Sequence, residues 1–150
     1  MRLAVRIAHI SLTALDAERL AAFYRTVFGF EDRRPPRHLR GEILSRGNGL
    51  ADIGVQSFWL HLPEAPQCFL EILQYDITQE RPAPAVNAIG LGHIALAVAN
   101  IHRAFEAILQ HGGEKQGEIT DLGSPDQPIL VVYTRDPEGN ILELEQVHGG

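Results

Sequence analysis

The chain has 150 residues, 45% of them hydrophobic, which is enough for one globular domain with a buried core. A formal net charge of −6 argues against nucleic acid or an anionic membrane surface as the main partner, because both are polyanions, and so favours a small-molecule substrate. The sequence holds no run of about 18 apolar residues and opens without a cleavage-site pattern, which together predict a cytoplasmic protein.

The first half of the chain alternates strand-like and helix-like patterns. Asp16 is placed to cap a helix whose apolar residues recur three and four positions apart, and Gly29 is placed to end it. A stretch rich in Pro, Arg and Gly then predicts a long inserted loop. The predicted elements are, in chain order, a strand over 9–12, a helix over 17–28, an inserted loop over 33–55 and a hairpin of strands over 58–62 and 68–75.

The second half repeats this order, which indicates an internal duplication. Asn100 takes the place of Asp16 as the helix cap, and the cap lies 12 residues before the terminating glycine (100 to 112) against 13 in the first half (16 to 29). The predicted elements are a strand over 93–98, a helix over 101–111, a strand over 128–134, a tight turn over 136–140 and a strand over 141–144.

These patterns predict an α+β fold in one domain that spans residues 1–150. The domain is expected to contain two modules, each with the order strand, helix, strand, strand, strand. Module one is expected at about 5–77, a proline-containing linker at about 78–90 and module two at about 91–148.

Each module carries one histidine in its first strand and one glutamate in its last strand: His9 and Glu71, then His93 and Glu143. Strand side chains alternate between two faces, so the apolar neighbours pack under the helix and these four side chains point to the other face. A carboxylate within an apolar strand is costly unless it has a partner such as a cation. Imidazole and carboxylate ligands together favour one divalent ion: Ni, Zn, Co, Mn or Fe.

Taken singly, the same residues have simpler interpretations. One strand histidine is more often a hydrogen-bonded, half-buried residue, and one strand glutamate often blocks edge-to-edge aggregation. Only the coincidence of all four favours a metal site. Arg37 and Arg40, in the inserted loop, are candidates for binding an anionic substrate, with a solvated basic loop as the alternative. Three strand aromatics are candidates for lining a cavity, although such residues more often belong to the core: Trp59, Tyr75 and Tyr133.

Three segments make the chain resemble the vicinal oxygen chelate superfamily of glyoxalases, bleomycin-resistance proteins and extradiol dioxygenases. They are FYRTVFGFE at 23–31, GHIALAV at 92–98 and DPEGNILELEQ at 136–146, and the resemblance spans residues 7–146. It implies two paired βαβββ modules that form an incomplete eight-stranded barrel around a metal ion. It also implies a homodimer, and it carries the ligand roles onto four residues: His9, Glu71, His93 and Glu143.

The complete set of four ligands resembles the lactoylglutathione lyase type most closely. This implies a metal-dependent lyase or isomerase that abstracts a proton next to a carbonyl and stabilises a metal-bound enediolate. Glu143 and Glu71 are the candidate catalytic residues, and analogy favours Glu143 as the base. Two alternatives are a bleomycin-resistance-like binding protein, whose relatives typically lack the ligands, and an Fe(II) dioxygenase, which leaves the Glu71 position without one.

Overall fold

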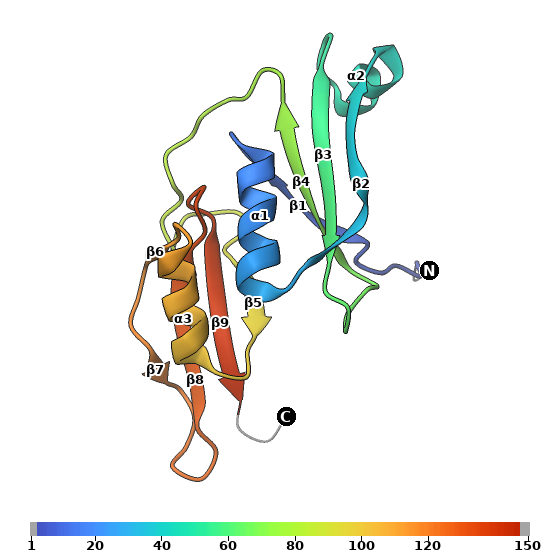
Figure 1. Ribbon diagram of the computed structural model, residues 1–150. Helices are drawn as coiled ribbons and strands as arrows, with labels where there is room; N and C mark the ends of the chain where they lie inside the picture. The colour runs from blue at the N-terminus through green and yellow to red at the C-terminus, as the bar shows by residue number, and fades with distance from the viewer. Residues whose placement is uncertain (1–2, 148–150) are drawn as a thin grey trace. The chain divides into compact units, whose positions relative to one another are not determined.

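The computed structural model describes residues 3–147, and the chain separates into two compact units, Met1–Glu80 and Arg81–Gly150 (Figure 1). Each unit contains one mixed sheet with a helix on one face, so the predicted α+β class with βαβββ modules is confirmed. Neither sheet closes into a barrel by itself. Among the described residues, no helix is long and apolar enough to cross a membrane.

The first unit has a four-stranded sheet in the order β1-β4-β3-β2, in which only β1 and β4 run parallel. Helix α1 packs on β3 and β4. Its predicted caps are confirmed, because the Asp16 side chain accepts a hydrogen bond from the Arg19 N–H and Gly29 has a φ of 71°. The elements are β1 (His9–Thr13), α1 (Ala17–Phe28), β2 (Glu31–Arg40), α2 (Glu42–Asn48), β3 (Gly54–His61) and β4 (Phe69–Tyr75).

The second unit repeats this plan with the order β5-β9-β8-β6, and β7 also pairs with β8. Helix α3 lies along β8 and β9 (Figure 1) and is capped by the side chain of Asn100, as predicted. The elements are β5 (Ile94–Ala97), α3 (Ile101–Gln110), β6 (Glu114–Lys115), β7 (Thr120–Asp121), β8 (Ile129–Arg135) and β9 (Ile141–Val147).

The strand expected between α3 and β8 is split into two short pieces. Lys115 pairs with Thr134 and Thr120 pairs with Val131, so four residues lie between β6 and β7 opposite only two on β8. The backbone N–H groups of Gln116 and Gly117 both donate to the Tyr133 carbonyl, which closes this bulge. The described chain therefore has nine strands rather than eight.

A glutamine in the last strand of each unit ties that strand to the start of the helix. The Gln74 side chain accepts a hydrogen bond from the Ala17 N–H at 3.0 Å, and the Gln146 side chain accepts one from the Ile101 N–H at 2.7 Å. Each glutamine lies three residues after a predicted glutamate ligand. Since side chains of a strand alternate, the contact fixes Glu71 and Glu143 on the face away from the helix.

Residues 33–55, expected as a loop, instead form most of β2, the helix α2 and the start of β3. Two adjacent prolines interrupt β2, but β2 is the edge strand and its register shifts between Arg34 and Arg37, so the missing proline N–H groups leave no gap within the sheet. Helix α2 begins after Gly41 and ends at Gly49, which has a φ of 69°. This segment forms a strand because it pairs with β3 at the edge of the sheet, where a shifted register is tolerated.

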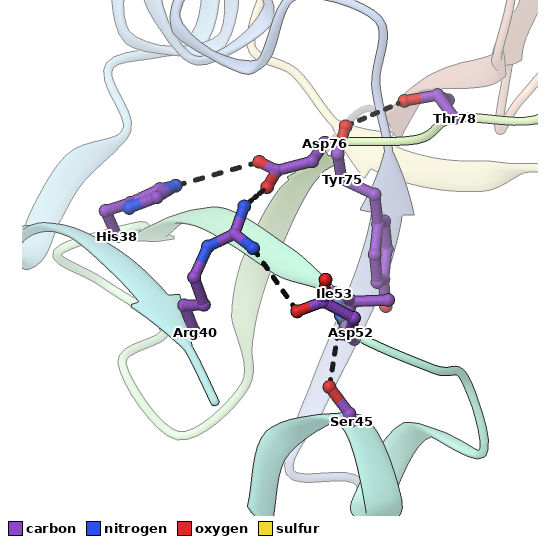
Figure 2. A network of polar contacts seen from close by, with 8 residues as sticks. All are labelled: His38, Arg40, Ser45, Asp52, Ile53, Tyr75, Asp76 and Thr78. Atoms are coloured by element: carbon purple, nitrogen blue, oxygen red, sulfur yellow. Dashed lines mark hydrogen bonds and ion pairs between the residues drawn. The ribbon is translucent and has the colours of Figure 1, made fainter. Parts of the chain in front are cut away.

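Side chains at the end of β2 and β4 join α2 to the sheet (Figure 2). Arg40 pairs with Asp76 and lies 3.5 Å from Asp52, while His38 lies 3.7 Å from Asp76. The Ser45 hydroxyl of α2 accepts a hydrogen bond from the Ile53 N–H at 3.1 Å. Arg40, one of the two arginines predicted for substrate binding, is therefore held in a structural cluster.

Candidate active site

In the first unit, the structure brings two predicted ligands together on the face of the sheet away from α1. His9 Nε2 lies 3.5 Å from Glu71 Oε2, with the His9 side chain 41% exposed and the Glu71 side chain 16% exposed. Their strands run parallel, and His9 and Ser11 of β1 are in register with Phe69 and Glu71 of β4. His9 and Glu71 therefore occupy adjacent positions on one face.

Trp59 holds the other oxygen of Glu71. The two residues face each other directly across β3 and β4, and Trp59 Nε1 donates to Glu71 Oε1 at 2.9 Å. Because an indole can only donate, this contact satisfies one carboxylate oxygen and leaves the other turned toward His9.

The second unit repeats this arrangement with different chemistry. His93 immediately precedes β5, and its Nε2 lies 2.8 Å from Glu143 Oε2 on β9, whose side chain is 11% exposed. Tyr133 faces Glu143 directly across β8 and β9, and their side chains are hydrogen-bonded. The rings of His93 and Tyr133 meet edge to face at 5.2 Å. In both units a histidine and an aromatic donor thus flank one glutamate.

The hydrogen bond to Glu143 raises the pKa of Tyr133 above its usual value of 10.0, and burial and the charges of Glu143 and Glu145 raise it further. We expect the alkaline absorbance titration of the metal-free protein to contain a phenol transition centred above 10, which Tyr133→Phe removes. Tyr75→Phe is the control, since the Tyr75 hydroxyl bonds Asn48 instead, and should leave this transition in place. Loss of a transition at or below 10 in Tyr133→Phe would contradict the assignment.

Sequence patterns named Trp59 and Tyr133 only as candidates for lining a cavity, with the core as the alternative, and did not predict their contacts with the glutamates. The signal that identifies them is hairpin register. Trp59 precedes Glu71 by 12 residues and Tyr133 precedes Glu143 by 10, and in each hairpin the two residues form a directly opposed pair. Side chains paired in this way lie close enough for contact.

The donor atoms of each pair suit a divalent ion. Two ligands bound to one ion at about 2.1 Å, with an angle between octahedral and tetrahedral, stand about 3.0–3.4 Å apart. The His–Glu distances of 3.5 and 2.8 Å lie close to this range. Within either unit, no further His, Cys, Asp or Glu among residues 3–147 joins a pair to form a larger metal-binding group.

Comparison with known proteins gives the class. The family model of the Glyoxalase/Bleomycin resistance protein/Dioxygenase superfamily matches residues 6–144, and the chain belongs to this family. Members of the superfamily generally bind a divalent metal.

The similar proteins include curated enzymes. Human mitochondrial methylmalonyl-CoA epimerase is 24% identical over 141 residues, covering 94% of this chain and 73% of the relative. An ethylmalonyl-CoA/methylmalonyl-CoA epimerase of Cereibacter sphaeroides is 26% identical over 147 residues, covering 95% and 98%. The crystal structure of a glyoxalase family protein from Bacillus cereus has a TM-score of 0.86 at 19% identity, covering 99% of this chain and 97% of that one. Family and relatives together support an enzyme of the isomerase or lyase kind.

Proposed function

We propose that this protein is a metal-dependent isomerase that moves a proton at a carbon next to a carbonyl group. The observation that carries the proposal is the repeated arrangement of one histidine, one glutamate and one aromatic donor, at matching positions of the two units. The epimerases among the curated relatives favour isomerase chemistry over the lyase of the glyoxalase type.

The proposed ligands of the ion are the four residues predicted from sequence: His9, Glu71, His93 and Glu143. Imidazole and carboxylate ligands bind Ni, Zn, Co, Mn or Fe ions, so the availability of each metal decides which one is bound. When bound, such an ion supplies electrostatic stabilisation of negative charge on substrate oxygens. The hydrogen bonds from Trp59 and Tyr133 orient the two carboxylates, and partners of this kind typically change metal affinity or activity by about 10–100-fold.

Glu143 and Glu71 are the proposed catalytic residues. One of these glutamates, as a carboxylate, takes the proton from the substrate carbon, and the other, as a protonated carboxylic acid, gives a proton to the same carbon. Return from the opposite side inverts the carbon, which is the outcome of an epimerase. Such general acid and base help typically contributes about 10²–10⁴-fold to the rate.

Exchange of the substrate proton with solvent tests the proposal. Purified protein, with its metal content measured, is incubated in deuterated water with methylmalonyl-CoA or with the hemithioacetal of methylglyoxal and glutathione. Deuterium incorporation at the carbon next to the thioester, measured by NMR and dependent on a stoichiometric divalent metal, is the expected result. Conversion of the hemithioacetal, with no exchange in methylmalonyl-CoA, would indicate a lyase of the glyoxalase type instead. Tight binding of bleomycin-like compounds without metal, or oxygen consumption with catechols, would replace the proposal by a binding protein or a dioxygenase.

A further inference from the structure

The open face of the first sheet, beside Glu71, carries arginine side chains stacked on aromatic rings. The Arg34 guanidinium lies 4.1 Å from the centroid of the Trp59 ring, and the Arg33 guanidinium lies 4.9 Å from that of Phe69. The Phe69 ring contacts those of Trp59 and His9 at centroid distances of 4.6 and 4.9 Å. An aromatic row, His9, Phe69 and Trp59, thus leads from the predicted ligand His9 to the arginines of β2.

Register places Arg37 on the same face as Arg34. Arg34 pairs with Trp59 and Arg37 pairs with Ser57, and these two positions of β3 share one face because they are two residues apart. The extra residue between the arginines lies in the register shift of β2. Arg34 also donates to the Ser57 hydroxyl at 2.9 Å, which keeps its guanidinium over this face.

These cations are not neutralised. Within residues 3–147, no carboxylate forms an ion pair with Arg33, Arg34 or Arg37. Arg34 Nε is buried without a hydrogen-bond partner. Burial, followed by the charge of Arg37, lowers the pKa of Arg34, and Glu71 opposes this only in part. An anion bound between the two guanidinium groups would relieve their repulsion and satisfy their remaining N–H donors.

On the described strands of the second unit, the one arginine is already bonded to other groups. The guanidinium of Arg135, on β8, is bound by Gln116, by the Gly139 carbonyl and by the Pro84 carbonyl. On β9, Glu143 and Glu145 alternate with buried leucines, and both glutamates carry negative charge. In a chain with a net charge of −6, the arginines of β2 are therefore a local exception.

We propose that Arg34 and Arg37 bind an anionic group of the substrate, a carboxylate or a phosphate, on the open face of the first sheet. The statement that this anion belongs to a substrate rests on the proposed function. It replaces the pair Arg37 and Arg40 expected from sequence, because Arg40 is bonded to Asp76. The flat rings of Trp59 and Phe69 form the apolar floor of this site.

Trp59 is the chain's only tryptophan, so its fluorescence reports on this site directly. Metal-free protein, prepared over a chelating resin, is titrated with malonate and separately with inorganic phosphate, against chloride at matched ionic strength. We expect a saturable change in Trp59 fluorescence with at least one of the two anions. Arg37→Gln, which changes an exposed residue, should weaken this binding about tenfold or more. Arg19→Gln, the same charge change on the exposed side of α1, should leave it unchanged.

A response to malonate alone assigns a carboxylate, and a response to phosphate alone assigns a phosphate; both support the site. Malonate and phosphate that behave like chloride, or equal affinities in Arg37→Gln and Arg19→Gln, would overturn it. The titration needs neither metal nor turnover. Binding without proton exchange would therefore remove only the proposed reaction, and proton exchange without anion binding would remove only this site.

Discussion

Replacement of Glu143 by glutamine is expected to lower the turnover number for proton exchange by about 10²–10⁴-fold. Glutamine has nearly the same shape as glutamate but cannot take a proton from the substrate carbon. Glutamine keeps a side-chain oxygen that can accept the hydrogen bond from the Tyr133 hydroxyl, so the folded structure should persist. Deuterium incorporation gives the rate, and elemental analysis separates loss of chemistry from loss of metal.

Glu145→Gln is the matched control, since Glu145 lies two residues further along β9 and changes the same charge. We expect it to retain most of the activity. Unchanged turnover and metal content in Glu143→Gln would exclude Glu143 from the reaction. Glu71→Gln is measured in parallel with each isomer of the substrate. Each variant should lose proton exchange mainly for the isomer whose proton the replaced glutamate removes, which shows which carboxylate is the base for that isomer.

Replacement of Ile72 by alanine is expected to lower the free energy of unfolding by about 2–5 kcal/mol. Ile72 is 0% exposed on β4, between the sheet and α1, and its loss leaves a cavity directly behind Glu71. Ile43→Ala is the control, because Ile43 is 80% exposed on α2 and should change stability by no more than about 0.5 kcal/mol. Chemical denaturation followed by Trp59 fluorescence measures both. Similar losses in the two variants would show that the core is not where the structure places it.

The duplication was predictable because both copies carry the same local signals, such as helix caps, at matching positions. Asp16 and Asn100 cap their helices as predicted, and α1 spans the expected residues 17–28. The glutamates lie on the face away from the helix, as strand alternation required, since Leu70, Ile72, Leu142 and Leu144 are all buried. The joining of the four predicted ligands around one ion and the module boundaries stay predictions.

Residues 33–55 mark the limit of such reasoning. Their prolines, glycines and arginines predict a loop, yet β2 forms there because β3 offers it an edge with a shifted register. The same strand pairing places Arg34 over Trp59 and Arg40 beside Asp76. Contacts with the neighbouring strands therefore determine which arginines of β2 are available to bind a substrate.

Sequence patterns alone predict the repeated order of elements, the helix ends and the faces of the four predicted ligands, because helix caps, glycines and strand alternation act within a few residues of one another. The folded structure was needed to show that Trp59 and Tyr133 hold the two glutamates and that Arg34 lies over the ring of Trp59. Those contacts join different strands, and cross-strand register depends on how each whole sheet packs against its helix rather than on any short stretch of chain.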